Sequence, residues 1–516
     1  MKNFKFNTKD NTIHILLIAF ATLTPFLVPL LLVTISGNNI FHIAPYYVGG
    51  DAVARYDYIR NILENGQILG YNGYDFVLAK IPSLGSAWGF FWTFPYLIFG
   101  KLFGWDLNAP IIANILFLCL ANLIFILLTK ANKNTTIGVI VISALLFINI
   151  DYSISSMSEP SRYAITIVLV GMMYRLAYFE TGYIFKYFAV PATIIFGAAT
   201  FILLSAFIIP YCLLIIKCKN NFVKGGITLL IFGISTILIK KSNSLFCTPY
   251  YEVFNMKKDI IAFKEHGLLM GIIVTIRNSL HNLMRFSYGA FTNINYQHGK
   301  FTWFVLICWI LIFALAYTYI FKKYRSDKDK YIVLGALYLL LIITMGYIVL
   351  YNDVIATLIR GINTALCGAV FLLTLMDSRK ILMLYVVLAL IWSPFFVSNF
   401  MSMCNEDYRC LTQQQEREIQ IKRDIAAKYI KLDKNADPWE NTVAIRYGGK
   451  STAFAIPSGA GKISMHNVTI NEHARYVLIG TDGSAKDIQN AVNDHLSANH
   501  SLITQNNYFT ILKRND

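Results

Sequence analysis

The chain has 516 residues, of which 56% are hydrophobic and only 14% are charged, and its mean hydropathy is +0.52. These values lie far outside the range of soluble globular domains, so water is not the main solvent of the protein. The net charge is +16, but the basic residues form short clusters between apolar runs and no continuous basic face, which argues against nucleic acid as a partner. Composition therefore predicts a polytopic membrane protein.

Apolar runs of about 20 residues recur along most of the chain, which is the length that a helix needs to cross the bilayer core. A transmembrane β-barrel would instead show short alternating strands. We expect the first run to stay as an uncleaved anchor. About eleven transmembrane helices are predicted, at residues 13–35, 109–130, 135–152, 161–179, 184–203, 204–217, 223–240, 301–321, 331–350, 355–376 and 380–399.

Basic residues between the spans predict the orientation, because such residues are enriched in cytoplasmic turns. If the N-terminal lysines are cytoplasmic, every other basic turn falls on the same side, provided that the apolar stretch 83–103 does not cross the membrane. We interpret that stretch as an interfacial or re-entrant helix, which its tryptophans and tyrosine suit. The basic turns carry Lys130 and Lys133, Arg175 and Lys186, Lys217 to Lys224, the cluster 322–330, and Arg379 with Lys380.

The outer side then receives three loops, 37–108, 151–162 and 241–300, and a C-terminal domain, 401–516, that follows the membrane domain 1–400. The tail is predicted to be a small α/β domain. Its expected helices are 405–430 and 485–496, and its expected strands are 442–447, 453–456, 475–479 and 508–512. For Cys404 and Cys410 a disulfide and two thiols are equal alternatives.

The first outer loop contains an acid at the start of an amphipathic helix. Asp51 follows Gly49 and Gly50 and precedes the helical stretch 52–65. A carboxylate at the membrane surface, next to glycines that allow close approach, is suited to accept a proton from an incoming hydroxyl. The alternative is that Asp51 only caps the helix, and the two roles are compatible.

The second outer turn brings further acids to the same side. Asp151 begins it, and Glu159 and Arg162 end it. The alternative reading is a helix start, with Ser158 as N-cap, Glu159 in the first turn and Pro160 early in the helix. Two acidic turns on one side of a bundle can surround a single polar head group.

Basic residues on the outer side are candidate phosphate ligands, since arginine can hold a phosphate through two parallel hydrogen bonds. For each residue singly, ordinary snorkelling or solvated charge is the competing interpretation. The candidates are Lys80, Arg277, Arg285 and Arg360. The middle of the spans holds almost no ionisable residue, which argues against an ion-coupled transporter.

The order of these features resembles the GT-C glycosyltransferases, membrane enzymes that use lipid-phosphate sugars and include the protein O-mannosyltransferases and the aminoarabinose transferases of lipid A. Asp51 after the first span, the amphipathic helix, the segment Phe94 to Gly104 with its Lys-Leu-Phe-Gly ending, and the acidic turn at 151–159 carry the resemblance. It covers nearly the whole chain as a match of architecture. One departure is Ala52, where the family often has a second acid.

The resemblance implies an inverting transfer of a sugar from a polyprenyl phosphate, such as undecaprenyl phosphate, to an acceptor hydroxyl in the periplasm. Asp51 would be the general base, and Glu159, or alternatively Asp151, would orient the acceptor or assist a divalent metal. Asp57, Arg55, Asp151 and Arg162 would contact the acceptor, and Lys80, Arg277, Arg285 and Arg360 the donor phosphate.

The implied setting is the bacterial inner membrane, with a cytoplasmic N-terminus, a periplasmic C-terminal domain and membrane lipids around the helices. Within the class, the chain is similar to serotype-converting O-antigen glucosyltransferases. Two alternatives stay open: an O-antigen polymerase or ligase, and a flippase of lipid-linked sugars without chemistry.

Overall fold

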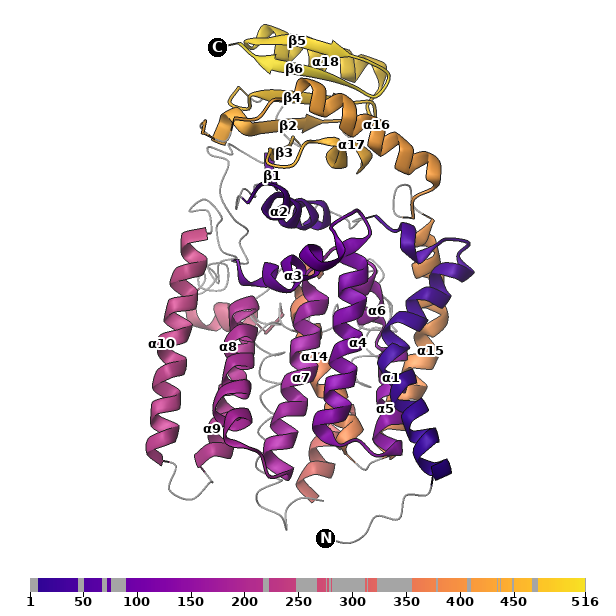
Figure 1. Ribbon diagram of the computed structural model, residues 1–516, viewed down its shortest axis with the longest axis vertical. Coiled ribbons are helices and arrows are strands. Elements are labelled where there is room, and N and C mark those ends of the chain that lie inside the picture. Colours follow the sequence, from indigo (N-terminus) through magenta and orange to yellow (C-terminus); the bar gives the residue numbers. More distant parts are fainter. Residues whose placement is uncertain are drawn as a thin grey trace.

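The computed structural model describes residues 8–44, 51–66, 72–75, 90–216, 222–246, 267–274, 276–277, 280, 311–312, 314–322, 355–376, 379–405, 410–433, 435–436, 438–447, 450–465 and 472–515. Two layers make up this part of the chain: a bundle of upright helices and a smaller domain with a sheet, stacked on one end of the bundle (Figure 1). We call this end of the bundle the domain end.

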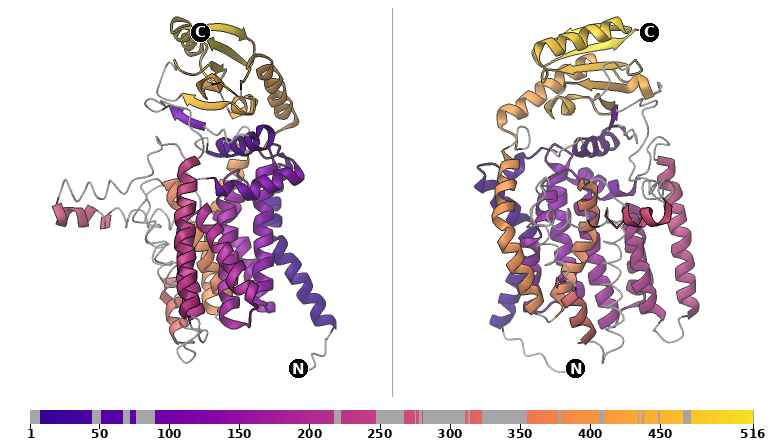
Figure 2. Two further views of the ribbon diagram at one scale, coloured as in Figure 1. Left: turned by 60° about the vertical axis from the view of Figure 1, so that its left-hand side comes forward. Right: turned by 180° about the vertical axis from the view of Figure 1, so that it is seen from behind.

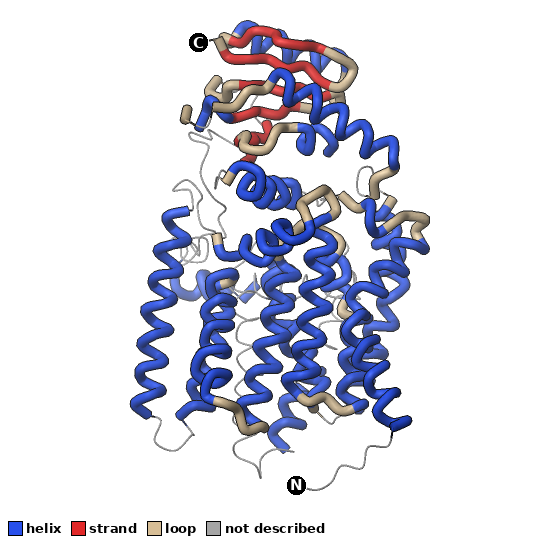
Figure 3. The backbone as a smooth tube through the Cα atoms, in the orientation of Figure 1, coloured by secondary structure: helices blue, strands red, loops and turns tan. Residues whose placement is uncertain are grey.

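The bundle consists of upright apolar helices, some long and some short (Figures 1 and 3). They are α1 (Thr8–Ile35), α4 (Ala109–Thr129), α5 (Lys133–Leu145), α7 (Glu159–Tyr178), α8 (Val190–Thr200), α9 (Ile208–Ile216), α10 (Phe222–Phe246), α14 (Ile355–Leu375) and α15 (Arg379–Cys404). The π-helical turn Phe185–Ala189 precedes α8, and the 3-10 helix Ile202–Phe207 separates α8 from α9.

Four helices in the described part of the chain are long and apolar enough to cross a membrane, within α1, α4, α10 and α15. A fifth crossing results if α5 and α6 (Phe147–Ser153), which meet at an angle of 63°, form one broken span. These helices agree with five of the expected spans. Most of the expected spans 301–321 and 331–350 lies outside the described residues, so the number eleven stays a prediction.

Basic residues gather at the end of the bundle opposite the domain end. The Arg175 guanidinium donates to the carbonyl of Leu128 at the end of α4, at 3.3 Å, and the Lys130 ammonium lies 4.6 Å from the centre of the Phe179 ring. Arg175 also lies over the Phe185 ring. The expected grouping of basic turns is thus present at this end for α4, α5 and α7; the side of the membrane it faces stays a prediction.

Two helices lie across the domain end of the bundle (Figure 1). Helix α3 (Phe94–Phe103) follows the 3-10 turn Phe91–Thr93 and lies over the bundle, as expected for a segment that does not cross. Above it, α2 (Asp51–Asn65) separates the bundle from the sheet, and both views of Figure 2 show the same layering. Buried aromatic residues of α2, of the 3-10 turn and of α3 pack together, among them Tyr58, Trp92 and Tyr96.

The domain contains a six-stranded mixed sheet of order β1-β3-β2-β4-β6-β5. Strands β1 to β4 are parallel, and β6 is antiparallel to both of its neighbours. The strands are β1 (Asn72–Asp75), β2 (Thr442–Arg446), β3 (Gly461–Met465), β4 (Tyr476–Gly480), β5 (His500–Gln505) and β6 (Phe509–Arg514), and the helices are α16 (Gln413–Tyr429), α17 (Lys450–Ala455) and α18 (Ala485–Ser497), with a 3-10 turn at Pro438–Asn441.

The α/β class of the tail is confirmed, with three corrections. The expected strand 453–456 is wrong, because Lys450–Ala455 is helical. The sequence reading missed β3 and β5, and it placed no strand of the first loop in this sheet, although β1 pairs with β3. Finally, α15 continues to Cys404, past the expected end of the last span at residue 399. Of the two alternatives left open for Cys404 and Cys410, the structure has the thiols.

Candidate functional site

Helix α2 presents two polar rows to two different partners, because residues three or four positions apart share a face of a helix and residues two apart do not. Arg55 and Tyr58 point to the bundle, where they contact Trp92. Asp57 and Asn61 point to the domain, where they contact Lys462 and Gly459. The helix therefore has a bundle face and a domain face.

The bundle face carries a buried Arg–Glu–Arg cluster. The Arg55 Nη1 atom donates to Glu159 Oε2 at 2.9 Å and also to the Ser158 hydroxyl. The Arg162 Nη1 atom lies 3.7 Å from Glu159 Oε1. The Arg55 and Glu159 side chains are only 6% and 2% exposed. Two parts of the chain that are a hundred positions apart thus meet around one carboxylate.

The start of α7 explains where this carboxylate lies. Ser158 is at the N-cap position and Pro160 is in the first turn, as the helix-start reading predicted. The Ser158 side chain nevertheless makes no capping bond, and it accepts a hydrogen bond from Arg55 instead. The positive end of the helix dipole stabilises the negative charge of Glu159, as the two arginines do. The helix start and the ion cluster are therefore one structure.

The turn before α7 is fixed by an amide inside the bundle. Asn114 of α4 donates through Nδ2 to the carbonyls of Ser155 and Met157, at 2.6 Å and 3.0 Å. The Tyr96 hydroxyl of α3 donates to Asn114 Oδ1 at 2.6 Å. Burial raises the pKa of Tyr96, so this hydroxyl stays protonated and keeps donating. The interfacial helix α3 thereby helps to hold Glu159 in place.

These residues do not suit a divalent metal. Two guanidiniums and one carboxylate sum to one positive charge, so a cation at Glu159 would be repelled by both arginines. In the part of the chain that the structure describes, no group of three or more His, Cys, Asp or Glu residues is arranged to hold a metal ion. The cluster is better suited to oxygen atoms of an anionic or hydroxylated ligand.

Asp51 is the first residue of α2, and its side chain lies outside the described set. Arg55 follows four residues later, about 6 Å along the helix at 1.5 Å per residue. Because Arg55 contacts Glu159, Asp51 begins its helix at the same end of the bundle as Glu159. Both acids were expected on one side, and the backbone places them there.

The domain face of α2 carries a second buried ion pair. Asp57 accepts a short hydrogen bond from the Lys462 ammonium of β3, and these side chains are 2% and 5% exposed. Burial lowers the pKa of Lys462 to about 8, although the nearby Asp57 carboxylate works in the opposite direction. Asp57 is thus on the opposite face of α2 from the Arg55–Glu159–Arg162 cluster.

The remaining predicted residues are placed as follows. Asp151 is buried in α6, the element before the turn that leads to Glu159. Arg360 lies in α14, with its side chain outside the described set, and Arg277 is exposed in a short helical stretch. Lys80 and Arg285 lie outside the described residues. Among the predicted residues whose side chains the structure describes, it brings together Arg55, Glu159 and Arg162.

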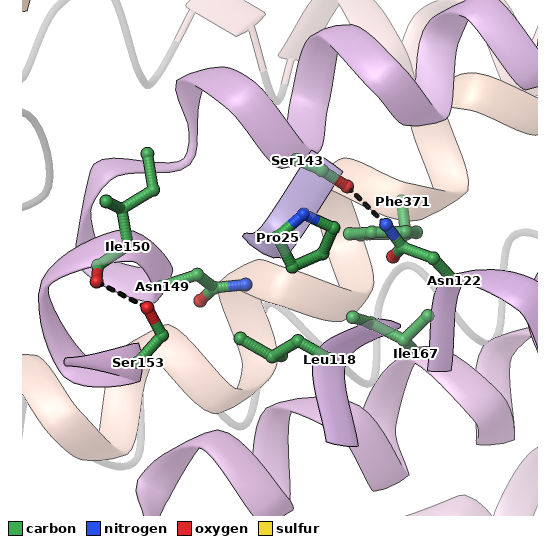
Figure 4. Close-up of a pocket in the computed structure, with 9 residues that line it drawn as sticks. All are labelled: Pro25, Leu118, Asn122, Ser143, Asn149, Ile150, Ser153, Ile167 and Phe371. Atoms are coloured by element: carbon green, nitrogen blue, oxygen red, sulfur yellow. Dashed lines mark hydrogen bonds between the residues drawn. The ribbon is translucent and has the colours of Figure 1, made fainter. Parts of the chain in front are cut away.

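A small cavity lies inside the bundle between α1, α4, α5, α6, α7 and α14 (Figure 4). Asn122 and Asn149 face it, and the Asn122 amide donates to the Ser143 hydroxyl at 2.9 Å. Its volume of about 10 Å³ is at the limit of what one water molecule needs. A sugar does not fit there.

Sequence reasoning missed three residues that shape this region: Tyr96, Asn114 and Lys462. A signal existed for Asn114, because an amide in the middle of an apolar span needs a partner. None existed for Lys462, whose role depends on a strand pairing between residues 72 and 462.

No protein-family model matches this sequence, and no curated protein matches it. Among solved structures, ArnT from Cupriavidus metallidurans bound to undecaprenyl phosphate matches with a TM-score of 0.50 and 9% identity, over 97% of this chain and 98% of that one. The apo state of ArnT gives a TM-score of 0.49 and 10% identity over 98% of each chain. The chain therefore has the overall fold of ArnT.

Proposed function

We propose that this protein is an inverting glycosyltransferase that moves a sugar from a polyprenyl phosphate, such as undecaprenyl phosphate, to an acceptor hydroxyl. The observation that carries the proposal is the buried Arg55–Glu159–Arg162 cluster, which lies at the same end of the bundle as Asp51. The ArnT fold supports it, because a solved ArnT binds undecaprenyl phosphate.

In this proposal Asp51 is the general base. Its carboxylate takes the proton of the acceptor hydroxyl as that oxygen bonds to the anomeric carbon of the sugar. The bond from that carbon to the phosphate oxygen breaks, and polyprenyl phosphate leaves with the electron pair. Attack opposite the leaving group inverts the configuration of the anomeric carbon.

Glu159 acts as an orienting and electrostatic residue. Its carboxylate accepts a hydrogen bond from Arg55 and forms an ion pair with Arg162, so it fixes where the two guanidiniums point. In this scheme Arg55 and Arg162 contact the acceptor. For the phosphate we propose Arg360 of α14 and Arg285, with Lys80 and Arg277 as further candidates. No metal takes part in this scheme.

The proposed setting is the bacterial inner membrane, with the domain end facing the periplasm. The proposed acceptor is a cell-surface glycan such as O-antigen or a lipid-linked glycan, and a serotype-converting glucosyl transfer is its narrowest form. A membrane-impermeant maleimide added to cells should label a cysteine at the exposed Asp482 and not one at the exposed Glu180. The reverse pattern would contradict the orientation.

The test of function is sugar transfer by the purified protein in detergent, supplied with polyprenyl-phosphate sugars and a glycan acceptor. We expect Asp51→Asn to lower kcat by roughly 10²- to 10⁴-fold, the usual contribution of a general base. The matched control is Asp482→Asn, the same change at an exposed position of the domain. Equal transfer by the wild type and Asp51→Asn would refute the base, and absence of transfer with every donor would favour a flippase.

A further inference from the structure

Four residues of α2 bind one short segment of the domain, residues 456–462, which leads from α17 into β3. Asn61 Oδ1 accepts a hydrogen bond from the Gly459 amide at 2.6 Å, and Asn65 Nδ2 donates to the Ser458 hydroxyl at 3.0 Å. Asp57 pairs with Lys462. Arg60 reaches the Ile456 carbonyl at 3.5 Å. The domain face of α2 is therefore held from Asp57 to Asn65.

The same segment is also tied to the first loop through its backbone. Strand β1, which follows α2 in the chain, pairs in parallel with β3, and Asn72 lies opposite Lys462. Lys462 thus lies on β3, the strand with which β1 of the first loop pairs, and its side chain contacts α2, the helix that precedes β1. Helix, strand and domain form one closed unit around this lysine.

The unit also constrains the bundle face. A helix is a stiff rod at this length, so whatever fixes Asp57 and Asn61 also fixes Arg55, which lies on the same 15-residue helix. Below the helix, Arg55 contacts Glu159, and the Trp105 Nε1 atom donates to the Tyr56 carbonyl at 3.0 Å. Movement of the domain would therefore move α2 relative to Glu159.

We propose that Lys462 is a positioning residue: through Asp57 it holds α2 at the height and rotation at which Asp51 and Glu159 can act on one substrate. The inference rests on the proposed function. In this view the C-terminal domain is a part of the catalytic apparatus that contributes no reacting group. A buried ion pair is suited to this role, because it has one preferred geometry where an apolar contact has many.

The test compares three variants by kinetics and by cross-linking. Lys462→Met removes the charge, and Asp57→Asn with Lys462→Met removes both charges, so that no lone buried charge opposes folding. Glu440→Gln is the matched control, because it breaks an ion cluster with Arg475 and Arg514 that lies within the same domain and includes no residue of α2. Correct folding of each is checked by size-exclusion chromatography in detergent.

Positioning predicts that the folded double variant loses kcat by roughly 10- to 100-fold, the scale of small misplacements of reacting groups, while the donor KM changes little. Glu440→Gln keeps the wild-type kcat. A double variant that folds and regains the wild-type kcat would show that the pair only stabilises the fold, and would overturn the proposal.

The cross-linking arm does not depend on activity. Cysteines at Asn65 and Ser458, whose side chains are in contact, are joined with a short bismaleimide and the link is counted by mass spectrometry. We expect the link to form less often with Lys462→Met and normally with Glu440→Gln. An unchanged link in Lys462→Met would overturn positioning even if transfer were observed, whereas a weakened link in a protein without transferase activity would refute the proposed function alone.

Discussion

The two ion clusters on either side of α2 are both buried, but they differ in composition. On the domain face, one carboxylate meets one ammonium, and the neighbouring contacts are hydrogen bonds from amides and backbone. On the bundle face, one carboxylate is shared by two guanidiniums. The Asp57–Lys462 pair has no net charge and is suited to hold two structural elements together. The Arg55–Glu159–Arg162 cluster has a net positive charge and is suited to bind a ligand. Burial of charge alone thus does not identify a site.

The largest loss of stability and activity is expected for Glu159→Gln, which removes the shared carboxylate of the bundle-face cluster. The change leaves two buried guanidiniums without their carboxylate, and removing one partner of a buried ionic group costs about 3–5 kcal/mol. We expect the melting temperature in detergent to fall and sugar transfer to be lost. The control is Glu416→Gln at the partly exposed pair with His42, which should change neither.

Arg55→Met is expected to cost less than Glu159→Gln. Glu159 keeps Arg162 as a partner, while the hydrogen bonds from Arg55 to Glu159 and to Ser158 are lost, and the one to the charged group is worth about 1.5–3 kcal/mol. Chemical denaturation followed by tryptophan fluorescence measures it. If Arg55→Met proved as severe as Glu159→Gln, the carboxylate would not be shared and the contrast between the two faces would disappear.

Tyr96→Phe tests the support of the bundle face and should have a smaller effect. It removes one hydrogen bond to Asn114, worth about 0.5–1.5 kcal/mol, while the ring keeps its packing. If the turn before Glu159 loosens, the rate of sugar transfer should also fall, by the factor that corresponds to this free energy. A normal kcat together with a lowered melting temperature would limit Tyr96 to stability.

The smallest expected effect is a change of activity with pH, which depends on the Asp57–Lys462 pair of the domain face. Because the pKa of Lys462 is lowered to about 8, we expect roughly half of the Asp57–Lys462 attraction to be lost near pH 8. Arg60 and Arg423, which face this lysine, favour its deprotonation. Transfer should then decline above pH 8, and Lys462→Arg should remove that decline.

Stability should respond to the same group in the opposite direction. Between pH 8 and the ordinary range of lysine, the unfolded chain binds more protons at this position than the folded one, so this group raises the free energy of unfolding as pH rises. Thermal unfolding followed across this range measures the effect. Activity and stability that fall together above pH 8 would point to general alkaline unfolding.

The sequence predicts well what depends on local pattern. Five of the span positions and the helix across the domain end follow from hydropathy, the basic turns at one end follow from charge, and the start of α7 follows from its capping residues. The sequence predicts that Arg55 and Glu159 lie on the same side of the membrane, but it does not predict that they pair.

What could not be predicted depends on long-range pairing. Strand β1 has four residues and takes its partner from a strand nearly four hundred positions later, so neither its existence nor the role of Lys462 is visible locally. The helix Lys450–Ala455 was mistaken for a strand because a short apolar run has no clear period.

The most direct measurement is the position of the donor lipid in a cryo-electron microscopy structure of this protein with polyprenyl phosphate. The account predicts the phosphate at the domain end of the bundle, beneath α2 and beside the cluster of Arg55, Glu159 and Arg162. A phosphate bound at the opposite end, among the basic turns around Arg175, would contradict it.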